Sequence, residues 1–211
     1  YTGNGSAGAT IGHGLSVAPD LVIAKRRTSA TEWWIVYHSS VCTGDDNWLA
    51  LNTTGALRSG GESMYDVSGF TSTTFGVNAG SGVNVSGATQ ISYCFHSVDG
   101  YSKIGSYVGN GSITNGPFVY TGFRPSMVIF KNATLADDWQ IQDTKRRPYN
   151  GIQNRLLPNS AAAEDTAIEA DVDFLSNGFK LRHSDNLMNA SGKIYIYIAF
   201  AESPFKHSNA R

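Results

Sequence analysis

Three close pairs of carboxylates are the first candidates for chemistry, because hydrolysis of a glycosidic bond requires two facing carboxyl groups. The pairs are Asp45–Asp46, Asp137–Asp138 and Asp171–Asp173. Adjacent residues of a strand point to opposite faces, so the first two pairs are poorly placed as acid and base. Asp171 and Asp173 can share a face, which suits either a calcium ion or, more commonly, turn carboxylates that accept local N–H groups.

The other reactive residue types form no catalytic or metal-binding pattern. The five histidines show no metal-ligand spacing, and no serine lies in a Gly-x-Ser-x-Gly elbow; they are His13, His38, His96, His183 and His207. The two cysteines, Cys42 and Cys94, form either a disulfide or two separate apolar contacts, and spacing does not decide between them. We therefore predict that the protein is not an enzyme, with no catalytic residues, no metal site and no cofactor.

Charge and hydropathy exclude two classes of partner. The 211 residues carry a net charge of −1, and only 16% of them are charged. The basic runs 25–27 and 145–147 are short and have acidic neighbours, which indicates solvated loops and no nucleic-acid surface. No apolar run approaches the ~18–20 residues of a membrane helix, so we expect no membrane insertion.

The sequence repeats itself with a spacing of 106 residues. Tyr1–Ser6 (YTGNGS) returns as Tyr107–Ser112 (YVGNGS), and Pro19–Lys25 (PDLVIAK) returns as Pro125–Lys131 (PSMVIFK). Such a match over the whole length indicates a tandem duplication, with domains at 1–106 and 107–211. The return of the Gly-Asn-Gly-Ser motif predicts a turn that the fold requires.

Between the turn motifs the apolar residues alternate with a period of two, which predicts short antiparallel strands. The expected fold is all-β, with two tandem, homologous β-sandwich repeats of lectin or jelly-roll type packed together. At most one short helix is expected, in the second copy over residues 160–170. The expected strands are 21–25, 33–38, 73–77, 90–96, 101–107, 128–131, 178–182 and 193–201.

The tryptophan strand of the first copy suggests where a partner binds. A spacing of 106 residues aligns Trp33 with Trp139, which makes Trp33, Ile35 and Tyr37 the core face. The opposite face is apolar in the first copy but polar in the second, where we expect it to contact water. Trp48 similarly corresponds to Arg155. In the second copy the polar residues of this face are Gln140, Gln142 and Thr144. In the first copy we predict that a ligand, another subunit or the other copy covers Trp34, Trp48 and His38.

The last strand of each copy is expected to place alternate large residues in the core. Ile91, Tyr93 and Phe95 correspond to the apolar residues Ile196, Ile198 and Phe200. On this interpretation the intervening residues, such as Ser92 and Cys94, face outward. The stretch 100–106 leads into the second copy, and the first copy has no counterpart to it, so we also expect sequence upstream of Tyr1.

Four motifs of the second copy resemble a known family. They are Tyr107–Ser112 (YVGNGS), Gly122–Pro125 (GFRP), Asp173–Arg182 (DFLSNGFKLR) and Tyr195–Lys206 (YIYIAFAESPFK). This pattern is similar to a C-terminal tandem repeat domain of uncharacterised function in structural and tail-fibre-like proteins of tailed bacteriophages, marine ones especially. In that family it often lies beside laminin-G or concanavalin-like lectin modules. The first copy departs from the pattern at 98–100, where Val-Asp-Gly replaces Ser-Pro-Phe.

The resemblance implies a non-catalytic virion module, exposed on the particle surface as part of a tail fibre, spike or capsid appendage. Attachment proteins of this kind are commonly homo-oligomers, so by analogy we expect a trimer that contacts other virion proteins. One alternative is a lectin-like module that binds host surface glycans through Trp34 and Trp48. A polysaccharide depolymerase is the third possibility, and the carboxylate spacing argues against it.

Overall fold

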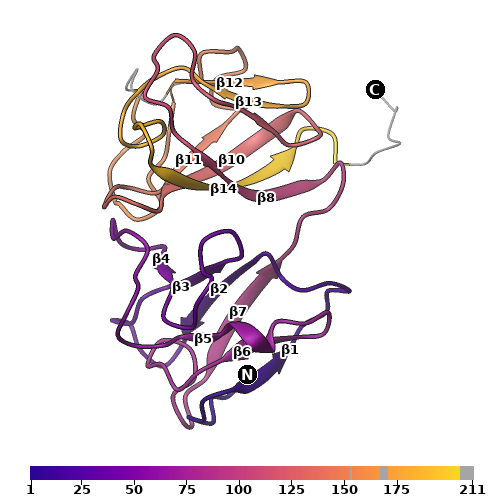
Figure 1. Cartoon of the computed structure of the whole chain (residues 1–211), viewed down its shortest axis with the longest axis vertical. Helices are drawn as coiled ribbons and strands as arrows, with labels where there is room; N and C mark the ends of the chain where they lie inside the picture. The colour runs from indigo at the N-terminus through magenta and orange to yellow at the C-terminus, as the bar shows by residue number, and fades with distance from the viewer. Residues whose placement is uncertain (153, 167–170, 205–211) are drawn as a thin grey trace. The chain divides into compact units, whose positions relative to one another are not determined.

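The computed structural model describes residues 1–152, 154–166 and 171–204, and its regular structure is almost entirely antiparallel β-strand (Figure 1). The chain divides into two compact units, Tyr1–His96 and Ser97–Arg211. This division lies ahead of Tyr107, where the sequence repeat begins again. Each strand expected from the alternation is present, with ends within three residues of the prediction. In the described part of the chain, no helix is long and apolar enough to cross a membrane.

The first unit contains a four-stranded and a three-stranded sheet, in the orders β4-β3-β2-β7 and β1-β6-β5. A single 3₁₀ turn, η1, follows β5 and is capped by Asp66, whose carboxylate accepts the N–H of Ser68 at 3.0 Å. The elements are β1 Ala9–Gly12, β2 Leu21–Arg26, β3 Ile35–His38, β4 Leu49–Ala50, β5 Tyr65–Asp66, η1 Val67–Gly69, β6 Thr74–Val77 and β7 Gln90–Phe95.

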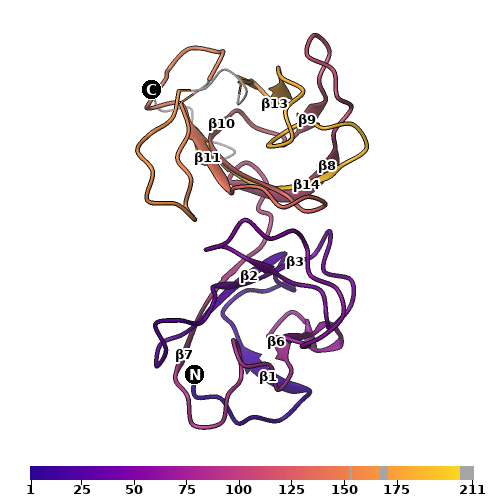
Figure 2. The ribbon, with the colours of Figure 1, turned by 90° about the vertical axis from the view of Figure 1, so that its left-hand side faces the viewer.

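The second unit also contains a four-stranded and a three-stranded sheet, in the orders β11-β10-β14-β8 and β12-β13-β9. Figure 2 shows β9 and β13 in a layer separate from β8, β10 and β14. Aromatic and aliphatic side chains from both layers form one hydrophobic core, in which Phe130 and Phe179 meet edge to face. The strands are β8 Ser102–Val108, β9 Phe118–Tyr120, β10 Pro125–Asn132, β11 Gln140–Asp143, β12 Val172–Leu175, β13 Gly178–Leu181 and β14 Ile194–Ala201.

No helix forms over 160–166, the described part of the stretch expected to be helical, and 167–170 lie outside the described residues. The short 3₁₀ turn lies instead in the first unit. Residues 205 and 206, which end the last motif of the resemblance, and His207 also lie outside the described residues. Cys42 and Cys94 are both free thiols.

Ladder register corrects the predicted faces of the tryptophan strand. Ala24 pairs with Ile35 in the first unit, whereas Phe130 pairs with Gln140 in the second, so Trp34 and not Trp33 corresponds to Trp139. The two equivalent tryptophan N–H groups both donate to an asparagine side chain, Asn52 and Asn159 respectively. The alignment by a uniform spacing was therefore wrong by one residue, which inverts every side chain of a strand.

The polar face expected in water is buried in the second unit. Gln140 and Gln142 lie opposite the core residues Phe130 and Val128, and both glutamines are 0% exposed. Their side-chain amides donate to the carbonyl oxygens of Leu187 (3.1 Å) and Ile152 (3.3 Å), which offsets the cost of burial. Thr144 is also buried. In the first unit the prediction for Ile35 and Tyr37 was correct, because Tyr37 contacts the core aromatics Tyr65 and Phe70.

The predicted faces of the last strand hold only in part. In β14 the hydrophobic core cluster contains Tyr197, Ala199 and Ala201, while Ile196 and Ile198 of the predicted face are also buried. In β7, Ile91 and Tyr93 are 36% and 45% exposed, so the expected core face of that strand points outward. The smaller side chains between them therefore face the interior of the unit.

The Gly-Asn-Gly-Ser motif closes the first unit through a buried asparagine. The Asn84 side chain, 1% exposed, accepts the N–H of Asn4 (3.0 Å) and donates to Asn4 Oδ1 (3.1 Å) and the Ser6 carbonyl (2.8 Å). A Cβ on Gly3 would lie 2.3 Å from the Val85 carbonyl oxygen, so only glycine fits there.

The same arrangement closes the second unit. Asn189, 0% exposed, accepts the N–H of Asn110 (2.8 Å) and donates to Asn110 Oδ1 (3.3 Å) and the Ser112 carbonyl (3.0 Å). We refer to Asn84 and Asn189 with these contacts as the asparagine clamps. The motif therefore performs the structural role that its repetition predicted.

Candidate functional site

Trp48, one of the three predicted binding residues, is part of the folded interior. It is 3% exposed, and its indole N–H donates to the Glu62 carbonyl at 3.1 Å. Its ring packs against Trp33 with 5.3 Å between centroids, and the Arg58 guanidinium lies over both rings at 4.4–4.8 Å. These contacts leave Trp48 no exposed ring face for a sugar.

Trp34 and His38 differ in their burial and in their hydrogen-bond partners. Trp34 is half-buried just before β3, and its backbone N–H donates to the Asn52 side chain. His38 is 0% exposed. Its Nδ1 accepts the backbone N–H of Ser40 at 3.2 Å, and the backbone N–H of His38 donates to Cys42 Sγ at 3.3 Å. The structure therefore places these residues in separate surroundings.

The carboxylates accept hydrogen bonds from other segments of the same unit, or form ion pairs there. Asp45 accepts the N–H of Val67 and the side-chain amide of Asn78, while Asp46 accepts the N–H of Gly60. Asp173 pairs with Arg182. Within residues 1–152, 154–166 and 171–204, no group of three His, Cys, Asp or Glu side chains is arranged to hold a metal ion.

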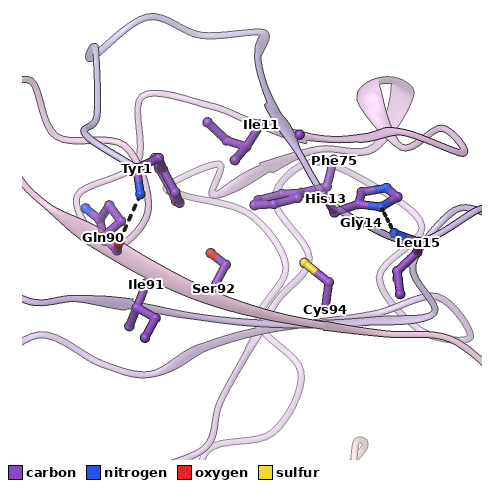
Figure 3. Close-up of a pocket in the computed structure, with 11 residues that line it drawn as sticks. Tyr1, Ile11, His13, Gly14, Leu15, Phe75, Gln90, Ile91, Ser92 and Cys94 are labelled. Carbon is purple, nitrogen blue, oxygen red and sulfur yellow. Dashed lines mark hydrogen bonds between the residues drawn. The ribbon is translucent and has the colours of Figure 1, made fainter.

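A cavity of about 500 Å³ lies inside the first unit, between β7 and the sheet that contains β1 and β6 (Figure 3). Ser92 and Cys94 point into it from β7, and Phe75 and Ile11 lie across from them. The Tyr1 ring closes one end of the cavity and packs edge to face on Phe75, with 6.3 Å between the ring centroids. The lining of the cavity is therefore mixed, with aromatic and aliphatic side chains beside the polar residues Gln90, His13 and Ser92.

The backbone beside this cavity is unpaired over part of its length. β7 is an edge strand, bonded to β2 on one side only. On its other side, Gln90 exchanges two backbone hydrogen bonds with Tyr1, at 2.8 and 3.2 Å. Alternation in an antiparallel ladder directs the backbone groups of Ser92 and Cys94 to that same side. No strand of the described residues pairs with them there.

The titratable groups around the cavity are held protonated or tied to backbone. Burial raises the pKa of the Tyr1 hydroxyl to about 12 and that of the Cys94 thiol to about 11. The Tyr1 hydroxyl donates to the Val83 carbonyl at 2.6 Å. His13 Nδ1 accepts the N–H of Leu15, and its Nε2 lies 3.2 Å from the Thr71 carbonyl oxygen. A thiol with a raised pKa stays protonated near neutral pH and is a poor nucleophile.

A second, smaller pocket of about 250 Å³ lies in the second unit. One of its walls is the ring of Tyr120, which is 64% exposed. Asp99, Lys103, Ser102 and Thr121 contribute polar groups to its lining. An exposed aromatic ring beside carboxylate, ammonium and hydroxyl groups is an arrangement that can hold a sugar ring.

Sequence reasoning missed Tyr1, Ser92 and Cys94 as parts of a site. The signal was present, because Ser92 and Cys94 occupy the positions of Tyr197 and Ala199 in the second copy. It was misinterpreted because this face of the strand was assigned to the outside.

Comparison with known proteins gives one match. A family model described as Domain of unknown function (DUF7483) matches residues 1–204. The chain belongs to this family. The DUF7483 match spans both compact units, including the cavity beside β7 and the Tyr120 pocket. No curated protein and no solved structure matches the chain.

Proposed function

We propose that the chain is a non-catalytic structural or attachment module of a bacteriophage virion. The observation that carries the proposal is the set of four second-copy motifs, Tyr107–Ser112, Gly122–Pro125, Asp173–Arg182 and Tyr195–Lys206, which resemble tail-fibre-like proteins of bacteriophages. The sequence resemblance to tail-fibre-like proteins supplies the virion context.

The proposal includes two tandem copies of one β-sandwich. Three kinds of correspondence support it. The three-stranded sheets match strand for strand, as β1-β6-β5 and β9-β13-β12, and in the four-stranded sheets β3-β2-β7 corresponds to β11-β10-β14. The β2–β7 and β10–β14 ladders have the same register, and the two asparagine clamps use equivalent donors and acceptors. Two copies of a rigid, weakly charged unit suit a protein of the exposed particle surface, as part of a tail fibre, spike or capsid appendage.

The partners in this proposal are other copies of the chain, as a trimer by analogy, and neighbouring virion proteins. The test is to locate the chain in purified particles with a gold-labelled antibody and electron microscopy. We expect label at one type of particle surface feature. Particles that carry no label, while the antibody still recognises the chain in infected-cell extract, would contradict the proposal.

A second candidate function is binding of host glycans, and the Tyr120 pocket is the observation that favours it. The structure moves this candidate away from Trp48, whose ring is buried. A glycan array probed with the whole chain and with Tyr120→Ala tests the idea, with Trp34→Ala as the matched control. Binding that survives Tyr120→Ala but fails with Trp34→Ala would place the sugar at Trp34 instead. An array without hits would argue against both positions.

A further inference from the structure

The second unit shows how the edge equivalent to β7 is covered. There β14 pairs with β8 over seven consecutive residue pairs, from Ile194 with Val108 to Phe200 with Ser102. β8 is the strand that leads directly into the Gly-Asn-Gly-Ser motif of that unit. The outer edge of β14 is therefore satisfied along its full length.

The first unit contains only the last two positions of the same ladder. Thr2 bridges Thr89, and Tyr1 pairs with Gln90, as Val108 pairs with Ile194 and Tyr107 with Tyr195. On this edge, the next positions along β7, at Ile91 to Phe95, have no partner strand among the described residues, whereas their other edge pairs with β2. The ladder between β7 and Tyr1–Thr2 therefore stops at Tyr1, whereas the equivalent ladder of the second unit continues along β8.

The side chains beside the open edge differ in size between the units. In the second unit Gly105 lies opposite Tyr197, and a Cβ on Gly105 would be 2.8 Å from the Tyr197 hydroxyl oxygen. The tyrosine therefore fills the interior and requires glycine in the facing strand. In the first unit Ser92 stands in place of Tyr197, and the 500 Å³ cavity lies beside it.

A buried polar group at the same place points to a missing neighbour. Gln90 is 3% exposed and lines the cavity, and its side-chain amide has no hydrogen-bond partner within the part of the chain that the structure describes. Buried amides are normally bonded, so a partner with backbone donors and acceptors would remove this cost.

We propose that the edge of β7 accepts an antiparallel strand that leads into Tyr1, as β8 leads into Tyr107. The strand bonds the backbone of Ser92 and Cys94. The residue two positions before Tyr1, which faces Ser92, carries a large apolar side chain that fills the cavity. This inference rests on the proposal that the units are copies of one fold. A strand continuous with Tyr1 is favoured over a separate chain, because Tyr1 already occupies the adjoining position in the ladder.

The test extends the whole chain at its N-terminus by six residues that copy Tyr101–Ser106. In one variant the residue that copies Gly105 is replaced by phenylalanine, in a second it stays glycine, and in a third it is proline. Proline has no N–H for the ladder, so the third variant is the matched control. Amide hydrogen exchange at Ser92 and Cys94 reports pairing, and labelling of the Cys94 thiol reports filling of the cavity.

We expect the phenylalanine extension to slow exchange at both amides by about tenfold or more and to protect Cys94. We also expect it to raise the melting temperature of the first unit by about 4–8 °C. The glycine extension should slow exchange less, and the proline extension should change nothing. Equal behaviour of the phenylalanine and proline variants would overturn the proposal.

Equal protection by the same six residues added as a free peptide would overturn the continuity with Tyr1. None of these measurements depends on the particle, so an unlabelled virion would contradict the proposed function and leave this inference standing.

Discussion

Replacement of either clamp asparagine by alanine should destabilise its unit strongly and by a similar amount. Asn84→Ala removes three hydrogen bonds of 2.8–3.1 Å from a side chain that is 1% exposed, and Asn189→Ala removes three of 2.8–3.3 Å. Each bond contributes about 1 kcal/mol net to stability. We expect each substitution to lower the free energy of unfolding by about 3 kcal/mol.

The measurement is guanidinium unfolding of the full-length variants, supported by calorimetry. A loss of about 3 kcal/mol corresponds to a fall of roughly 12 °C or more in the melting temperature of a domain of about 100 residues. Ser86→Ala and Ser191→Ala are the controls, because these exposed serines lie two residues beyond each clamp asparagine. Each control should stay within about 0.5 kcal/mol of the unmodified chain.

The reasoning predicts two separate effects, because each clamp lies within its own unit. If both clamp substitutions cost less than about 1 kcal/mol, the hydrogen bonds do not close the units as described. If Asn84→Ala is costly and Asn189→Ala is not, the two clamps are not equivalent despite their shared geometry.

Three further predictions concern pH, packing and backbone geometry. Burial lowers the pKa of Lys131 to about 8. Between pH 8 and 10.5 the folded state therefore binds fewer protons than the unfolded state. The stability of the second unit should rise by about 1.5 kcal/mol from pH 8 to 9.5 as a result. Burial raises the pKa of Cys42 to about 12, so the stability of the first unit should instead fall above about pH 9. Denaturant unfolding at several pH values measures both effects. Lys131→Met should remove the rise in stability of the second unit. Trp48→Ala should cost about 3–5 kcal/mol in chemical unfolding without reducing glycan binding. Gly116→Ala should cost about 2 kcal/mol or more in thermal unfolding, because its Cβ would lie 2.2 Å from a carbonyl oxygen of β13, whereas Gly14→Ala, with open space around it, should be neutral.

Sequence patterns were sufficient to locate the strands but not to orient them. Alternation and turn motifs placed the β7 and β14 strands within a residue of their ends. The choice of face failed in β11, where a one-residue difference in register reverses the side chains. Hydropathy did not reveal the error, because Gln140 and Gln142 are polar and buried, and the carbonyl groups that bind them come from distant segments.

The candidate site was harder to predict than the fold. Trp34, Trp48 and His38 were chosen because they are large residues without a counterpart in the second copy. Large residues can equally be absorbed by a core, as Trp48 is. The cavity beside β7 arises from the small side chains of Ser92 and Cys94 and from an unpaired strand edge. Neither feature has a strong signature in a single sequence, because both depend on which segments become neighbours.

The way the chain enters and leaves the second unit has a mechanical consequence. It enters through β8 at Ser102 and leaves through β14 at Ala201, and Ser102 pairs with Phe200. Both ends of the unit therefore lie at the same end of one antiparallel ladder. Tension applied across the unit pulls the two strands apart pair by pair, so each hydrogen bond carries the load in turn. We therefore expect the unit to unfold under force by sequential separation of β8 from β14, starting at the Ser102–Phe200 pair.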